Sequence, residues 1–160
     1  MTKITAIASY VPEIHEDNYE KALQFSVHPE FIDKKIGARF LAKASSAEQA
    51  SDLAQKAVSS LLKLTSLSLD KIDALIVCTQ NPDGFGLPHT SAIVHGKLEL
   101  PLDCACFDIS LGCSGYVYGL SIASGYMSFC GFQNVIFVNN WNPTNAVFLH
   151  ALFSIHNNGI

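Results

Sequence analysis

Residues 106–120 read Cys-Phe-Asp-Ile-Ser-Leu-Gly-Cys-Ser-Gly-Tyr-Val-Tyr-Gly-Leu, in which a run of small residues separates two apolar segments. The first segment, 104–109, is apolar except for one aspartate, and a short run of this kind is typical of a buried strand. In the second segment apolar residues recur at helical spacing as far as Met127, which predicts a helix. The small residues therefore form a tight turn between a buried strand and a helix, and Cys113 lies in that turn.

Cys113 is the candidate nucleophile of the chain. The turn residues Gly112, Ser114 and Gly115 carry little side-chain bulk, so another molecule can approach the Cys113 sulfur closely. If the helix begins within a residue or two of Cys113, its unpaired N–H groups and its dipole favour the thiolate over the thiol. The alternative is a small residue buried for packing, which is a common role for a free cysteine.

Strands and helices alternate along the chain. The continuous apolar run Ala74–Cys78 predicts a strand buried on both faces, and the capping box Ser45-Ser46-Ala47-Glu48 predicts a long helix as far as about Leu64. The other expected elements are a strand at 3–10, short helices at 18–25 and 29–37, a helix at 89–98 and a strand at 135–138. This alternation predicts an α/β fold in which helices cover a mostly parallel sheet.

Composition narrows the class of protein. The chain has 160 residues, which is one domain by length, and its 49% hydrophobic and 15% charged residues make it more apolar than an average soluble domain. We therefore expect it to bury surface against a partner. No apolar run is long enough to span a membrane, and the first residues lack the layout of a signal peptide, so we expect a cytoplasmic protein.

Cysteine content and charge give two further expectations. Five cysteines, an odd number without small-domain spacing, favour reduced thiols over a disulfide framework. The net charge of −4 argues against general nucleic-acid binding. The basic residues Lys34, Lys35, Arg39 and Lys43 nevertheless fall within ten positions, so a local basic surface is expected.

The segment Asp-Ile-Ser-Leu-Gly-Cys-Ser-Gly-Tyr at 108–116 resembles the nucleophile turn of the ketoacyl synthase III family, within the thiolase superfamily. The resemblance runs in the order of that family from Ile4 to about Asn139. It implies a layered, thiolase-like half with a mostly parallel mixed sheet. It also implies that Cys113 accepts an acyl group from acyl-CoA and passes it to malonyl-carrier protein in a decarboxylative condensation. The family dimerises, and it uses coenzyme A thioesters without a bound metal or redox cofactor.

The resemblance also implies substrate-binding residues. Phe31 matches an aromatic position, commonly tryptophan, that stacks on the adenine of coenzyme A, and Lys35 matches an arginine position. Lys34 and Arg39 could attract coenzyme A phosphates or an acidic carrier protein, although an ordinary solvated charged face is the alternative. Leu87 matches a position, often phenylalanine, that lines the partner subunit's acyl pocket, and a leucine there would admit a larger primer. The alternative for Leu87 is a core residue at the start of a helix.

The family's catalytic histidine and asparagine belong to a second, related half. His150 and His156 lie in a segment that departs from the family pattern, so neither is assigned that role. We therefore predict a domain at 1–139 followed by a divergent or truncated tail at 140–160. The Cys113 N–H could supply one oxyanion donor, with the companion donor in the absent half. The alternative function is a catalytically silent half-domain that serves only folding or dimerisation.

A zinc site is a further possibility to weigh. Cys104 and Cys106 together with Cys113 provide three thiols. Their period-two spacing instead places Cys104 and Cys106 on one face of a strand, and no well-spaced fourth ligand accompanies them. We therefore expect no metal site.

Overall fold

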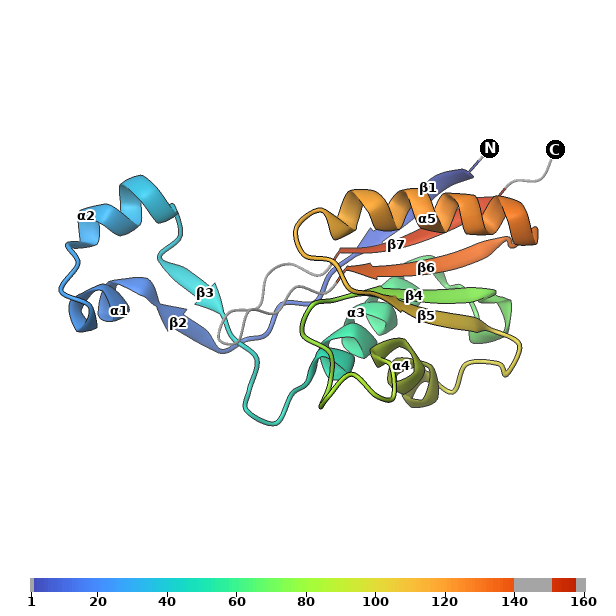
Figure 1. The fold of residues 1–160 in the computed structure, drawn as a ribbon, viewed down its shortest axis with the longest axis horizontal. Helices are drawn as coiled ribbons and strands as arrows, with labels where there is room; N and C mark the ends of the chain where they lie inside the picture. The colour runs from blue at the N-terminus through green and yellow to red at the C-terminus, as the bar shows by residue number, and fades with distance from the viewer. Residues whose placement is uncertain (1, 140–150, 158–160) are drawn as a thin grey trace.

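The computed structural model describes residues 2–139 and 151–157. A five-stranded sheet has helices on both faces, and a smaller helical arm projects from one end (Figure 1). The strands in chain order are β1 (Thr2–Ala8), β4 (Ala74–Cys78), β5 (Ala105–Ile109), β6 (Asn134–Asn139) and β7 (Ala151–Asn157). Their spatial order is β1-β7-β6-β4-β5. The predicted layered α/β fold is confirmed.

The sheet is mixed, with its parallel part around β4. This strand pairs in parallel with β5 and with β6, whereas β7 is antiparallel to both β1 and β6. Every residue of β4 is buried, as its continuous apolar run predicts. The carboxyl ends of β4, β5 and β6 meet at the end of the sheet that faces the arm (Figure 1).

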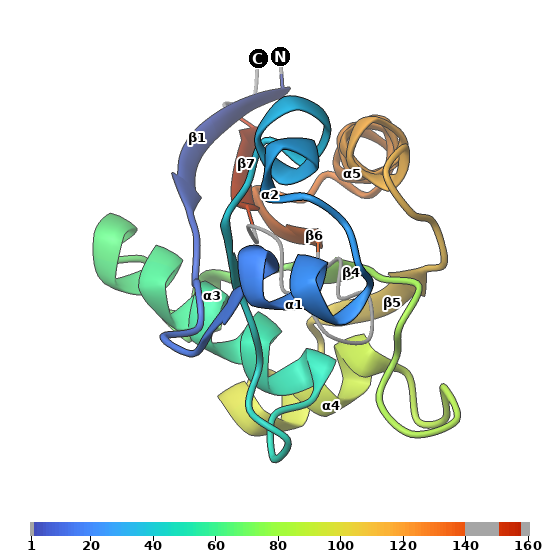
Figure 2. The same ribbon diagram turned by 90° about the vertical axis from the view of Figure 1, so that its left-hand side faces the viewer.

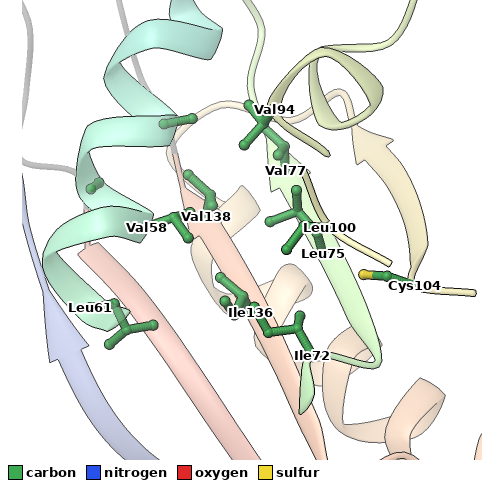
Figure 3. Packing of buried hydrophobic residues seen from close by; sticks show 12 residues of the cluster. Val58, Leu61, Ile72, Leu75, Val77, Val94, Leu100, Cys104, Ile136 and Val138 are labelled. Carbon is green, nitrogen blue, oxygen red and sulfur yellow. The ribbon is translucent and has the colours of Figure 1, made fainter. Parts of the chain in front are cut away.

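Two helices, α3 (Ala50–Thr65) and α4 (Thr90–Leu98), cover one face of the sheet. Val58 and Leu61 of α3 point onto the strands, with Val58 beside Val138 of β6, and Val94 of α4 lies near Val77 of β4 (Figure 3). All five side chains are fully buried. Each such burial stabilises the fold by about 1.5–3 kcal/mol, so this cluster is a main source of its stability.

On the opposite face, one helix is present among the described residues, α5 (Gly115–Cys130). Two glycines let it approach the strands closely. A Cβ atom at Gly119 would overlap the ring of Phe137, and one at Gly115 would overlap the sulfur of Cys78. The helix therefore lies closer to the sheet than it could if Gly115 and Gly119 carried side chains.

The long helix begins later than predicted. Its first residue is Ala50, and Gln49 and Asp52 form the capping box. The predicted pair forms only a turn, in which the Ser45 N–H donates to the Glu48 carboxylate at 2.9 Å. The helix start is also held by Asp83, whose carboxylate accepts a hydrogen bond of 2.9 Å from the Ser51 N–H. This partner is distant in sequence, so local pattern could not reveal it.

The arm consists of two short strands and two helical segments (Figure 2). They are β2 (His15–Asp17), α1 (Asn18–Gln24), α2 (Pro29–Phe31), a π-helical turn at Ile32–Ile36 and β3 (Phe40–Ala42). The two predicted helices are confirmed, and Gly37 ends the second one with a φ of 74°. The antiparallel pair β2–β3 was not predicted. Asn18 ties the two ends of the arm together, because its side-chain amide donates to the Ala38 carbonyl at 2.8 Å.

Part of the predicted tail belongs to the sheet. Strand β7 pairs on one side with β1 and on the other with β6, so Ala151–Asn157 lies inside the layered unit. The rest of the predicted tail, 140–150 and 158–160, lies outside the described residues. In the part of the chain that the structure describes, no helix is long and apolar enough to cross a membrane.

Candidate functional site

Cys113 lies in the turn between β5 and α5, at the end of the molecule nearer the arm (Figure 1). The helix begins at Gly115, with Ser114 as its N-cap residue, so the predicted position of Cys113 at a helix start is confirmed. The Gly115 N–H donates to the Gly112 carbonyl at 2.8 Å and closes the turn. Cys113 is exposed, which contradicts the alternative of a buried packing cysteine.

The turn is packed from one side by the end of β4. Thr79 donates its N–H to the Ile109 carbonyl at 3.0 Å, which ties the ends of β4 and β5 together. Next to it, the Gln80 side chain lies against Gly112, where an added Cβ would stand 2.7 Å from the Gln80 amide oxygen. The glycine at 112 therefore leaves room for Gln80 beside the candidate nucleophile.

Asp108 is a site residue that sequence reasoning left without a role. Its two carboxylate oxygens each accept a hydrogen bond of 2.8 Å, one from the Thr90 N–H and the other from the Ser91 N–H. A carboxylate at the first turn of a helix satisfies unpaired N–H groups and interacts favourably with the helix dipole. Asp108 thus joins the last part of β5 to the start of α4, five residues before Cys113. Its signal in the sequence is a single charge within an apolar strand.

The described cysteines differ in their surroundings. Burial raises the pKa of the Cys78 thiol, and it raises the pKa of the Cys104 thiol to about 11. These two sulfurs are therefore protonated at neutral pH. Cys113 and Cys130 are the exposed members of the set. Among the described residues, no group of three or more His, Cys, Asp or Glu side chains is arranged to hold a metal ion.

Phe31 and Lys35 come together in the arm. They line a surface depression of about 280 Å³, together with His28, Glu30 and Lys34. Lys34 forms an ion pair with Glu30 one helical turn away. The depression thus offers a half-exposed aromatic ring next to ammonium groups. A planar group that carries phosphates has chemistry that matches this pair of features.

Arg39 lies apart from this depression. Its guanidinium stacks between the rings of Tyr19 and Phe40, at 4.7 and 4.8 Å from their centroids. It also forms an ion pair of 3.0 Å with Asp17. The hydrogen bond from Arg39 holds the pKa of the Asp17 carboxyl below its ordinary value. The charge of Arg39 is therefore already engaged by Asp17 and two rings, which ties β2 to the residue that precedes β3.

Leu87 lies in the loop between β4 and α4. Its side chain is 78% exposed, so the alternative of a core leucine is wrong. Phe85 in the same loop is fully exposed. The loop also carries Asp83, the carboxylate that holds the start of α3. A loop anchored at one end thus presents two large apolar side chains to the outside.

Comparison with known proteins finds relatives that match most of this chain. The chain is 36% identical over 126 residues to the β-ketoacyl-[acyl-carrier-protein] synthase III 2 of Halalkalibacterium halodurans. The matched region covers 79% of this chain and 37% of that protein. It is 32% identical over 154 residues to the β-ketoacyl-[acyl-carrier-protein] synthase III of Caldanaerobacter subterraneus, which covers 91% of this chain and 46% of that protein. No family model matches the sequence.

The solved structures agree with these relatives. The crystal structure of a 3-oxoacyl-(acyl-carrier-protein) synthase III superposes with a TM-score of 0.86 at 28% identity. The match covers 99% of this chain and 51% of that chain. The chain thus spans about half the length of these proteins, or less, while between 79% and 99% of this chain is matched.

Proposed function

We propose that this chain, which belongs to the ketoacyl synthase III family and has its thiolase-like fold, carries the acyl-accepting nucleophile of a condensing acyltransferase. The observation that supports this most directly is the exposed Cys113 at the start of α5. Helix N–H groups and the positive end of the dipole favour an anionic sulfur at such a position. The acyl donor would be an acyl-CoA, and the acyl acceptor a malonyl-carrier protein.

The first half-reaction is a transfer between thioesters. The Cys113 thiolate attacks the carbonyl carbon of the acyl-CoA and forms a carbon–sulfur bond, the carbon–sulfur bond to coenzyme A breaks, and coenzyme A leaves as a thiolate that takes a proton from water. The developing oxyanion needs N–H donors. The Cys113 N–H is the donor we propose, since the Gly115 N–H already donates to Gly112.

The second half-reaction is the condensation. The malonyl group loses carbon dioxide, the resulting carbanion attacks the acyl-cysteine carbonyl, and the Cys113 thiolate leaves. The family's histidine and asparagine, which stabilise the carbanion, have no assigned counterpart here. His150 lies outside the described residues. Of His156 only the main chain is described, paired with Lys3 and Asn134.

The proposed contacts with substrate come from the arm and the β4–α4 loop. Phe31 would stack on the adenine of coenzyme A, and Lys35 would pair with its phosphates. Arg39 and Lys34 would add positive potential for an acidic carrier protein, each reduced by its own ion pair. Leu87 would reach the acyl pocket of a partner subunit in a homodimer, and its size would favour a primer larger than acetyl.

The second candidate is a catalytically silent half-domain that serves only folding or dimerisation. Incubation with radiolabelled acyl-CoAs separates the two. We expect label to be retained by the unchanged chain and lost in Cys113→Ala. The matched control is Cys130→Ala, which removes an exposed cysteine from the other end of the same helix. Equal labelling of the unchanged chain and Cys113→Ala would support the silent half-domain.

A further inference from the structure

The side chain of Gln80 reaches from the end of β4 to the turn that holds Cys113. Strand β4 ends at Cys78, and Gln80 is the second residue after it. A Cβ atom added to Gly112 would stand 2.7 Å from the Gln80 amide oxygen and 3.5 Å from its amide nitrogen. Both polar atoms of the amide therefore lie against the residue that precedes the candidate nucleophile.

Two hydrogen bonds attach the end of β4 to the same turn. The Thr79 N–H donates to the Ile109 carbonyl at 3.0 Å, and the Cys78 thiol donates to the Leu111 carbonyl at 3.5 Å. Thr79 is buried, so its main chain is held firmly in place. Gln80 follows directly, and its position relative to the turn is therefore set before any substrate arrives.

The Gln80 amide is available to a substrate. An amide side chain has two N–H donors and an oxygen that accepts hydrogen bonds. In the described part of the chain, the Gln80 side chain makes no hydrogen bond, and the residue is exposed. The next residue turns the main chain back, because the Asn81 N–H donates to the Thr79 hydroxyl oxygen at 3.1 Å. An open amide group is thus held beside the exposed sulfur of Cys113.

We propose that the Gln80 side-chain amide is a catalytic residue that donates a hydrogen bond to the carbonyl oxygen of the acyl group as Cys113 accepts it. This inference rests on the acyl transfer proposed above. When the Cys113 sulfur bonds to the carbonyl carbon, an electron pair of the carbonyl double bond moves to oxygen. Donors fixed in advance stabilise that charge, and glutamine side chains are among the groups that serve in this way.

The two donors come from neighbouring strands. The Cys113 N–H belongs to the turn after β5, and the Gln80 amide follows β4, which pairs with β5. The oxyanion then reforms the carbonyl, the bond from carbon to the departing sulfur breaks, and the departing thiolate takes a proton from water. Acylation of Cys113 is therefore supported by two donors within this chain.

A neutral amide suits this position. A carboxylate beside Cys113 would repel both the thiolate and the developing oxyanion. An amide donates a hydrogen bond without giving up a proton. Gln80 should therefore accelerate reactions that place charge on a carbonyl oxygen, and it should have no effect on reactions of the same sulfur that do not.

Two reagents that differ in this one respect test the proposal. S-butyryl-N-acetylcysteamine is a small thioester, and its attack by Cys113 passes through an oxyanion. Iodoacetamide alkylates the same sulfur without forming one. The thioester lacks the nucleotide of coenzyme A, so its reaction is independent of Phe31 and Lys35. Mass spectrometry of the peptide that contains Cys113 measures the rate of each reaction.

Gln80→Met nearly keeps the size of the side chain and removes its donors. We expect it to slow acylation at least about tenfold and to leave alkylation unchanged. Gln80→Glu should slow acylation further, because it adds a repelling charge. Gln133→Met is the matched control, since Gln133 is exposed beyond the far end of α5, and its acylation rate should equal that of the unchanged chain.

The outcomes separate this role from the acyl transfer itself. Equal acylation of Gln80→Met and the unchanged chain would overturn the role of Gln80 and leave the acyl transfer standing. Equal slowing of both reactions in Gln80→Met would also overturn it, because the side chain would then only support the turn. If the unchanged chain reacts with iodoacetamide but not with the thioester, the acyl transfer fails and the role of Gln80 fails with it.

Discussion

The ring of Phe137 on β6 occupies the space that a side chain at Gly119 of α5 would need. Both residues are fully or nearly fully buried, and they meet where the helix crosses the sheet. One turn earlier, Gly115 stands in the same relation to the sulfur of Cys78. Since Cys113 lies at the head of α5, these contacts set the height of the candidate nucleophile above the sheet.

Gly119→Ala should therefore destabilise the fold. The added methyl group forces the helix away from Phe137, and overpacking of this kind costs about 1–3 kcal/mol in the free energy of unfolding. Gly96→Ala is the control, because a methyl group added at Gly96 in helix α4 would meet no atom within 4 Å. There the helix propensity of alanine should stabilise the fold by about 0.5–1 kcal/mol. Urea unfolding of both variants measures the difference, and equal effects would contradict the close contact.

Asp108→Asn should weaken the link between β5 and α4. An amide group has one oxygen to accept the two N–H groups of Thr90 and Ser91, and it carries no charge to interact with the helix dipole. We expect a loss of about 1–2 kcal/mol in the free energy of unfolding. Asp103→Asn changes an exposed aspartate in the preceding turn and should leave stability nearly unchanged.

Thermal unfolding in the two aspartate variants checks this. Because Asp108 lies five residues before Cys113, Asp108→Asn should also slow acylation of Cys113 under conditions in which the variant is still folded. If Asp108→Asn keeps the wild-type labelling rate and the wild-type stability, Asp108 has no role in the site.

Local sequence pattern was sufficient to predict the elements that are marked by an apolar run or by a turn of small residues. Strand β4 is an unbroken apolar run, and α5 follows a turn of small residues, so both were predicted from neighbours in the sequence. The position of Cys113 at the start of α5 followed from the same turn. These features depend on contacts within a few residues or on burial of whole segments.

The features that were missed depend on partners far apart in the chain. Besides its local capping box, the start of α3 is held by Asp83, whose carboxylate accepts a hydrogen bond from the Ser51 N–H 32 residues away. Strands β2 and β3 have three residues each, and the ion pair between Asp17 of β2 and Arg39, the residue before β3, spans 22 positions. Contacts between residues so far apart leave no periodic pattern in the sequence. Side chains of this kind are only seen as partners once the fold has placed them together.

The stability of the fold should decline in alkaline solution through Cys104. Burial raises the pKa of this thiol from its ordinary value of 9.0 to about 11 in the folded chain. Between these values the unfolded chain releases the proton while the folded chain keeps it, so rising pH favours unfolding. We expect the loss to begin near pH 9 and to be complete above about pH 11.

Cys104→Val removes the titrating group and keeps an apolar side chain at a buried position. The dependence of the unfolding free energy on pH above 9 should therefore become shallower in this variant. Cys130→Val is the comparison, because that cysteine is exposed. If both variants follow the unchanged chain across this range, the pH effect does not come from Cys104.

Lys35→Glu should weaken the binding of acyl-CoA. The substitution reverses a charge in the depression that Phe31 lines, and an exposed charge pair contributes up to about 1 kcal/mol, which corresponds to about a fivefold loss of affinity. Lys63→Glu makes the same change of net charge at an exposed position on α3. Equilibrium binding of an acyl-CoA at two salt concentrations measures both variants. The loss in Lys35→Glu should shrink at high salt, because salt screens an exposed charge pair. Unchanged binding in Lys35→Glu, or an equal loss in both variants, would exclude a specific phosphate contact at this position.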